Sequence, residues 1–215
     1  MVGQTCRMLK SQQIYPTDLN DTQWLKIRPY LPAKAQTGRP REHGWRQILN
    51  GIFYLLQSGC SWRMLPSDLP PWKTVYHYFR VWRQDGTWEH LNRLLREKVR
   101  LRIGKKRQAS ASILDSQSAK TSEGGSERGF DAGKKVTGRK RHTLVDTLGL
   151  LMKVLVTAGD VQDRDGAKQL LENLAEEDQV VKRLKLIWAD GSYRGEWLWC
   201  INRKEGATQP SVMVD

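Results

Sequence analysis

The sequence is short of cysteine, of acidic residues and of long apolar runs, and each shortage excludes a class of protein. Its 3 cysteines, Cys6, Cys60 and Cys200, are widely spaced and form no CxxC pair, which excludes a disulfide framework and a structural zinc site. No apolar stretch approaches the roughly 18 residues of a membrane-spanning helix, and the basic N-terminus lacks the apolar segment of a signal peptide. We therefore expect a cytoplasmic protein.

Negative charge is outweighed by positive charge, and the excess is uneven along the chain. The 215 residues contain 36 Lys and Arg against 23 Asp and Glu, a net charge of +13. Residues 93–141 carry +10 of this, residues 1–92 carry +6 and residues 142–215 carry −3. This concentration of positive charge in one stretch favours binding to a polyanionic partner over a role in solubility alone. Nucleic acid is favoured over a membrane surface because no basic amphipathic anchor is evident.

Periodicity divides the chain into two predicted domains after a disordered tail at residues 1–14. Residues 15–108 are predicted to be helical, because apolar residues recur at helical spacing and glycine or proline ends each segment. Residues 109–215 change to short strands and intervening helices, which predicts an α/β domain. The predicted helices of the first domain are residues 24–31, a segment from Trp45 to just before Gly59, residues 72–83 and residues 87–102.

The helix predicted at residues 72–83 has a polar face suited to DNA. Lys73, His77 and Arg80 share that face, away from the apolar stripe, and would fit a major groove as part of a helix-turn-helix. The preceding turn is longer than the usual one, and a solvated face on an ordinary bundle helix explains the spacing equally well. The six tryptophans of this domain are predicted to pack in its core rather than to stack on bases.

The second domain shows the order strand, strand, strand, helix, strand, helix. The predicted strands are residues 112–115, the two arms of a hairpin at 142–147 and 150–157, and residues 184–189, with helices at 165–177 and 195–204. A glycine turn at residues 148–149 joins the hairpin arms. The last strand is predicted to join the first in parallel after a crossover.

Two of these strands end on an aspartate, Asp115 in SILDS and Asp190 in LIWADGS. They lie 75 residues apart in the sequence, so only the fold can bring them together. Neighbouring parallel strands would place both carboxylates at one edge of the sheet, where ligands collect. Carboxylate oxygens there suit Mg²⁺, and a pair of such ions supports phosphodiester chemistry. Strand-terminal turn residues are the alternative for each aspartate taken singly. Asp160, Asp163 and Asp165 are interpreted as a loop and a helix N-terminus.

Between the two aspartates lies a basic stretch at residues 131–142, DAGKKVTGRKRH. Its glycines would let the backbone approach phosphates, and its cations would contact them. A disordered basic linker is the alternative. The candidate DNA contacts in this stretch are Lys134, Lys135, Arg139, Lys140 and Arg141.

Taken together, these motifs resemble one family. YPTDL at residues 15–19, GRP at 38–40, GCSWRMLP at 59–66 and PWKTVY at 71–76 resemble the N-terminal domain of bacterial insertion-sequence transposases of the IS5/IS4 group. LDS around Asp115, the GKK and GRKRH runs, and ADGSY around Asp190 resemble the DDE core of the same family. The resemblance implies an RNase H-like fold in which Asp115 and Asp190 are the first two catalytic acids. It also implies two Mg²⁺ ions, which Mn²⁺ can replace. The implied partner is double-stranded DNA, both the element ends and the target, bound by a homo-oligomer.

The third acid of the family pattern is not found. Family members carry a glutamate on a late helix, tens of residues beyond the second aspartate, whereas Glu196 and Glu205 follow Asp190 too soon. We therefore expect a frameshifted or truncated copy with apolar surface uncovered near residues 150–157. Three functions stay open: a transposase, a non-catalytic DNA-binding inhibitor of intact copies, and an RNase H-like nuclease.

Overall fold

The computed structural model describes residues 14–33, 41–121, 128–175, 183–193 and 211–214. The chain divides into two compact units, Met1–Leu95 and Arg96–Asp215. The division falls inside helix α4 (Thr87–Arg102), whereas the sequence predicted a domain boundary after residue 108.

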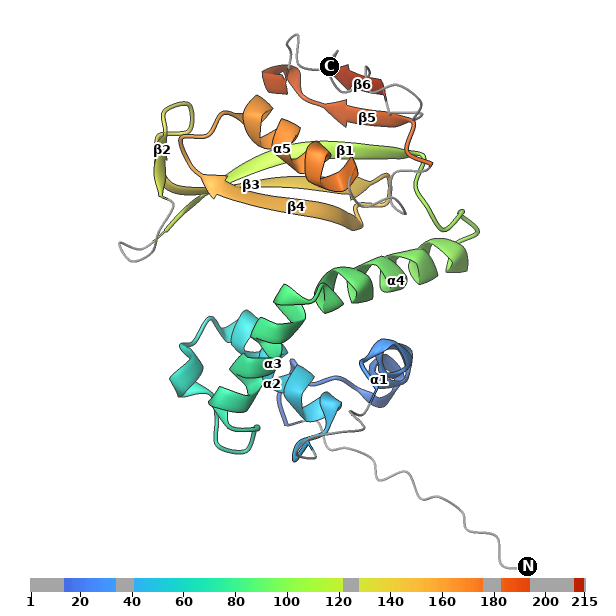
Figure 1. Ribbon diagram of the computed structural model, residues 1–215, viewed down its shortest axis with the longest axis vertical. Coiled ribbons are helices and arrows are strands. Elements are labelled where there is room, and N and C mark those ends of the chain that lie inside the picture. The colour runs from blue at the N-terminus through green and yellow to red at the C-terminus, as the bar shows by residue number, and fades with distance from the viewer. Residues whose placement is uncertain (1–13, 34–40, 122–127, 176–182, 194–210, 215) are drawn as a thin grey trace, which may run out of the picture. The chain divides into compact units, whose positions relative to one another are not determined.

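The first unit consists of helices, as predicted. They are α1 (Asp21–Ile27), a 3-10 turn η1 (Arg28–Tyr30), α2 (Trp45–Ser58), a 3-10 turn η2 (Trp62–Met64), α3 (Trp72–Gln84) and the first part of α4 (Figure 1). The Asn20 side chain caps α1 by accepting a hydrogen bond from the Gln23 amide at 2.8 Å. Gly59 ends α2 with φ of 66°, a left-handed conformation that glycine adopts at little cost.

The core of this unit is built from one stripe of α2 and one of α3. Ile48, Leu49 and Ile52 of α2 are buried against Val75 and Trp82 of α3. Aromatic rings complete this core, because Trp24, Trp45, Trp62 and Trp88 pack against it while partly buried. The expectation that most tryptophans serve packing is confirmed for these residues and Trp82.

The connection between α2 and α3 is long for a helix-turn-helix. It runs from Gly59 to Pro71 and contains η2, whereas the DNA-binding motif joins its two helices by three or four residues. The helix-turn-helix assignment therefore stays a prediction.

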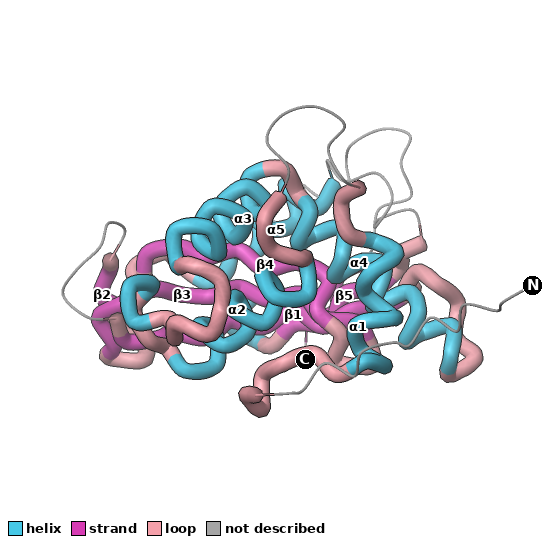
Figure 2. Tube along the Cα trace, turned by 90° about the horizontal axis from the view of Figure 1, so that it is seen from below, coloured by secondary structure: helices cyan, strands magenta, loops and turns pink. Residues whose placement is uncertain are grey.

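The second unit is a mixed sheet with the crossover that the sequence predicted. Its strands are β1 (Ala111–Lys120), β2 (Gly129–Asp131), β3 (Val136–Asp146), β4 (Leu151–Ala158), β5 (Leu186–Ala189) and β6 (Ser211–Val214). Strand β3 pairs antiparallel with β1, β2 and β4, while β5 pairs in parallel with both β1 and β6. Figure 2 shows the strands in magenta.

Several boundaries differ from the prediction. Strand β1 extends to Lys120, because the polar residues after Asp115 pair with the basic half of β3. The basic stretch is thus mostly strand and turn, which excludes the alternative of a disordered linker. Strand β6 was missed, helix α5 (Asp163–Ala175) begins and ends two residues before its prediction, and the helix predicted at 195–204 lies outside the described residues.

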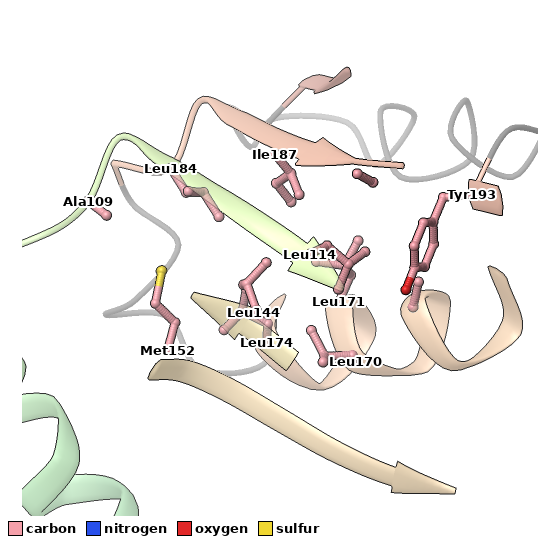
Figure 3. Packing of buried hydrophobic residues seen from close by; sticks show 12 residues of the cluster. Ala109, Leu114, Leu144, Met152, Leu170, Leu171, Leu174, Leu184, Ile187 and Tyr193 are labelled. Atoms are coloured by element: carbon pink, nitrogen blue, oxygen red, sulfur yellow. The ribbon is translucent and has the colours of Figure 1, made fainter. Parts of the chain in front are cut away.

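Helix α5 covers one face of the sheet (Figures 1 and 3). Its Leu170, Leu171 and Leu174 are buried against Leu114 of β1 and Leu144 of β3. Each such leucine contributes about 1.5–3 kcal/mol on burial. The helix approaches the sheet closely at Gly166, where a Cβ atom would lie 2.1 Å from the ring of His142. This close approach explains a glycine inside a helix, where it costs about 1 kcal/mol relative to alanine.

The opposite face of the sheet carries exposed apolar side chains. Ile113 pairs with Val145, and Val145 with Leu151, so these side chains share the face away from α5. Exposure is 38% for Leu151, 43% for Val154 and 46% for Val156. The expectation of uncovered apolar surface at residues 150–157 is confirmed for these three residues.

An ion pair connects the second part of α4 to the turn between β3 and β4. Gly149 adopts φ of 74° in the turn, as the predicted glycine hairpin requires. Asp146 Oδ1 accepts hydrogen bonds from the amides of Leu148 and Leu150, and Asp146 Oδ2 lies 2.5 Å from Nη1 of Arg100. Both members of this ion pair are buried. Residues 96–102 of α4 belong to the second unit.

Candidate active site

Strand pairing brings Asp115 and Asp190 to equivalent positions on neighbouring parallel strands. In the β1–β5 register Ile113 lies opposite Trp188, and the two aspartates follow two residues later on each strand. Asp115 lies within β1 and Asp190 directly follows β5, so both residues come to the same edge of the sheet on strands roughly 4.8 Å apart. The sequence predicted this arrangement from the strand ends alone.

Both carboxylates project from the face of the sheet opposite α5. Leu114 and Ala189, the residues before them, are buried against α5, whereas Asp115 and Asp190 are exposed. Asp115 Oδ1 accepts a hydrogen bond of 2.7 Å from the Ser116 amide, which fixes the orientation of this carboxylate.

Below the carboxylates, on the α5 face, lies a polar cluster that the sequence did not predict. Ser116 follows Asp115, and Lys134 Nζ lies 3.4 Å from the Ser116 hydroxyl. Burial, assisted by the charges of Asp163, Asp115 and Asp190, raises the pKa of the Tyr193 hydroxyl, while the Ser116 side chain opposes the rise. The cluster therefore lies close to both candidate catalytic acids.

Lys140 is the centre of a buried ion network and is not a surface cation. It is 5% exposed, and its Nζ lies 2.9 Å from Asp163 Oδ1 and 3.3 Å from Asp131 Oδ2. The same Nζ donates a hydrogen bond to the carbonyl of Val161 at 2.9 Å. Lys140 is therefore not available for the predicted contact with DNA. Side chains alternate between the two faces of a strand, and this residue of the basic stretch points inward.

The other cations of the basic stretch lie nearer the surface. Lys134 is exposed, and its Nζ donates to the carbonyl oxygen of Ser116 at 3.1 Å, which holds it beside β1. Lys135 is exposed in the turn with φ of 53°. Arg141 pairs with Gln117 and contacts its Oε1 at 2.5 Å, so it lies on the face that carries Asp115, about 7 Å further along the strand. Arg139 is half-buried on the same face of β3.

The predicted groove-reading face of α3 is exposed. Lys73, His77 and Arg80 are all exposed, while Val75 and Trp82 on the other side of the helix are buried. Lys73 Nζ lies 5.9 Å from the centre of the Trp72 ring. The face is thus accessible, and its contact with DNA remains a prediction.

Acid should destabilise the second unit in two phases. Burial, reinforced by the charges of Lys140 and Lys134, lowers the pKa of His142 from 6.5, against the opposing charge of Asp163. The unfolded chain therefore binds a proton more readily, and stability falls as the pH drops below 6.5. The hydrogen bond from Ser118, with help from Lys134 and Lys140, lowers the pKa of Asp131 from 3.8 to about 2, so stability falls again between these two values.

Urea unfolding followed by circular dichroism across this pH range tests the prediction. His142→Gln keeps a partner for the Thr157 hydroxyl, which lies 3.0 Å from Nε2 of His142. This variant should lose the phase that begins near pH 6.5 and keep the phase below 3.8. A variant that keeps both phases contradicts the assignment to His142.

The pair Asp115 and Asp190 fits a divalent cation only in part. Two adjacent, exposed carboxylates supply hard oxygen ligands of the kind that Mg²⁺ prefers. Among the described residues, no group of three or more His, Cys, Asp or Glu side chains is arranged to hold a metal ion. Glu196 and Glu205 lie outside those residues.

Comparison with known families assigns both parts of the chain. Residues 106–203, which include both aspartates, match the model of a transposase DDE domain, a class that uses a divalent metal. Residues 19–92 match a model described as a putative transposase of the IS4/5 family. The chain therefore belongs to the IS4/5 family of insertion-sequence transposases, which confirms the resemblance found in the sequence.

Two curated relatives match part of the chain, and one of them comes from an insertion element. An uncharacterized 16.2 kDa protein of insertion element IS402 from Burkholderia cepacia is 32% identical over 89 residues, which cover 38% of this chain and 60% of the relative. An uncharacterized protein from Sinorhizobium fredii is 27% identical over 73 residues, which cover 34% of this chain and 58% of the relative. The chain thus spans about three fifths of the length of each. No solved structure matches it significantly. Among the described residues, no helix has both the length and the apolar character that a membrane crossing needs.

Proposed function

We propose that this chain binds the ends of an insertion sequence and takes part in their Mg²⁺-dependent cleavage and transfer, with Asp115 and Asp190 as metal ligands. The observation that supports the proposal is the β1–β5 register, because it brings Asp115 and Asp190, both exposed, to the same edge of the sheet. The antiparallel strands β1, β3 and β4, followed by helix α5 and the parallel strand β5, support an RNase H-like core.

The chemistry follows from that position. Bound between these carboxylates, divalent ions would activate the attacking water or hydroxyl and stabilise the leaving oxygen. The protein's part is to hold two anionic side chains at a fixed spacing and to bring a phosphodiester to them. Lys134 and Arg141 lie beside Ser116 and Gln117, the residues that follow Asp115 on β1, and such cations would hold the backbone phosphates of DNA against the repulsion of the aspartates.

Cleavage of labelled duplexes carrying the ends of the encoding element tests the proposal. Mg²⁺-dependent strand cleavage at those ends, with Mn²⁺ able to substitute, supports it. Selective binding without cleavage would instead favour a DNA-binding inhibitor of intact copies. Cleavage of the RNA strand in a hybrid, without preference for element ends, would favour a nuclease.

The exposed face of α3 should contribute phosphate contacts. We expect Lys73→Ala/Arg80→Ala to weaken binding to element ends and to lower the slope of log K against log salt by about 2, because each lost phosphate contact removes about 0.9. Lys26→Ala/Arg28→Ala removes the same charge from exposed positions in α1 and η1 and serves as the control. Fluorescence anisotropy across a salt series measures both. Equal slopes for the two double variants would contradict a role for α3.

A further inference from the structure

We propose that the second unit carries a further DNA-binding surface where α4 leads into β1, and that this surface holds the backbone of duplex DNA without reading its sequence. It is formed by Arg102, Lys105, Lys106 and Arg107 and is called the α4–β1 surface below. The inference rests on the proposed function for the identity of its ligand, duplex DNA. It assigns a role to positive charges that lie outside both the basic stretch at residues 131–142 and the exposed face of α3.

Positive charge is concentrated at the end of α4 and is not balanced locally. Residues 98–110 contain six Lys and Arg and no Asp or Glu. The four side chains of the α4–β1 surface are exposed. Within the described residues, only Arg107 among these four forms an ion pair. Its Nη1 lies 3.9 Å from Glu97 Oε2, and its side chain remains 69% exposed. The surface therefore keeps most of its charge for a partner outside the chain.

The end of α4 does not need these cations as caps. Cations near the C-terminus of a helix often stabilise its free carbonyl groups. Here backbone amides already bond to those carbonyls, because Gly104 donates to Leu101 at 3.0 Å and Lys105 donates to Arg100 at 2.9 Å. Gly104 adopts φ of 75°, the left-handed conformation typical of this kind of helix end. The cationic side chains at and after this end are therefore available for another role.

The backbone that carries the α4–β1 surface is held in place by buried and half-buried arginines. Arg100 Nε donates a hydrogen bond to the carbonyl of Lys106 at 2.9 Å, and Nη1 of the same side chain pairs with the buried Asp146. Further along, Arg183 Nη1 donates to the carbonyl of Gln108 at 3.0 Å. Because this backbone is already ordered, less conformational entropy is lost when the cations bind a ligand.

The α4–β1 surface lies away from the candidate catalytic acids. It precedes Ala111, the first residue of β1, and Asp115 comes four residues later on the strand, roughly 13 Å further at about 3.3 Å per residue. This distance corresponds to about four base pairs of duplex at 3.4 Å each. A duplex that presents a phosphate to Asp115 reaches the surface only if it extends at least that far. The surface is thus placed to hold DNA beyond the cleaved position.

The chemistry of the surface suits phosphates and not base edges. Duplex DNA carries one negative charge per about 1.7 Å of its axis, so several neighbouring cations can contact phosphates at once. Residues 103–110 form no helix or strand that could enter a groove. Contacts to phosphates carry no sequence information of their own. The surface should therefore bind duplexes of different sequence with similar affinity.

Lys105→Gln/Lys106→Gln tests the inference on the full chain. Fluorescence anisotropy across a salt series measures binding to a duplex of arbitrary sequence. The slope of log K against log salt should fall by about 2, because each lost phosphate contact removes about 0.9. Arg164→Gln/Lys168→Gln removes the same charge from exposed positions on α5 of the same unit and should leave the slope unchanged. Thermal unfolding of both double variants checks that folding is preserved.

Cleavage kinetics separate this surface from the proposed active site. On duplexes carrying element ends, Lys105→Gln/Lys106→Gln should raise KM and leave kcat unchanged, because the surface does not touch the cleaved phosphate. A wild-type chain that binds duplex DNA but cleaves none would overturn the proposed function, and the salt series would still decide the inference. A wild-type chain that binds no duplex would overturn both.

Two further results would contradict a DNA-binding role for the α4–β1 surface. One is an equal slope for Lys105→Gln/Lys106→Gln and Arg164→Gln/Lys168→Gln. The other is a loss of binding to anionic phospholipid vesicles in Lys105→Gln/Lys106→Gln without a change in the DNA slope, which would assign the surface to a membrane.

Discussion

Asp115→Asn is expected to lower metal-dependent cleavage of element ends by about 10³-fold. The substitution removes one of two adjacent anionic ligands, and bound metal contributes several kcal/mol to stabilising the transition state. About 4 kcal/mol corresponds to three orders of magnitude in rate. Because Asp115 is exposed and the asparagine oxygen can still accept the hydrogen bond from the Ser116 amide, folding should be preserved.

The measurement compares initial cleavage rates with thermal unfolding of the same preparations. Asp165→Asn, at an exposed carboxylate in the first turn of α5, is the matched control and should retain the full rate. Asp190→Asn should reproduce the loss. Cleavage that survives in either Asp115→Asn or Asp190→Asn would show that the pair does not hold the metal.

Lys140→Met is expected to destabilise the second unit by about 3–5 kcal/mol. Methionine fills a similar volume, but it leaves the carboxylates of Asp131 and Asp163 without the ammonium group that lies between them. Both carboxylates are largely shielded from water, so they repel each other and gain little solvation in return. The large effect therefore comes from the charge that remains, not from the contact that is lost.

Chemical denaturation monitored by circular dichroism measures this loss. Lys135→Met, at an exposed position of the same β2–β3 hairpin, should change stability by less than about 0.5 kcal/mol. Lys140→Met/Asp131→Asn/Asp163→Asn should recover much of the loss, because it removes the unpaired charges. A single variant as stable as the wild type would refute the buried network.

Sequence patterns predicted those parts of the fold that depend on local periodicity. The apolar stripe from Trp45 to Leu56 is sufficient to define α2, and Gly59 marks its end. The carboxylate pair was also predictable, since Asp115 and Asp190 each follow a short apolar run, and a parallel crossover brings such strand ends together.

Long-range polar contacts were not predictable in the same way. Lys140 lies in a run of basic residues, and only the register of β3 shows that it points inward while Arg141 points outward. Its partners Asp131 and Asp163 come from β2 and the start of α5, and nothing in their local sequence marks them as buried. Side chains along residues 138–144 alternate between inward and outward, and the apolar Leu144 marks the inward positions, which include Lys140. The run of positive charges obscured this pattern.

The parallel pairing of β1 with β5 also determines when the carboxylate pair forms as the chain folds. The β3–β4 hairpin closes a short loop around Gly149, so its contacts form at small entropic cost. Ala111 and Leu186 begin the β1–β5 register and are separated by the hairpins and α5, so joining them closes a much longer loop. We therefore expect the hairpin to form before Asp115 and Asp190 meet. A partly folded chain that holds only this hairpin would lack the paired acids.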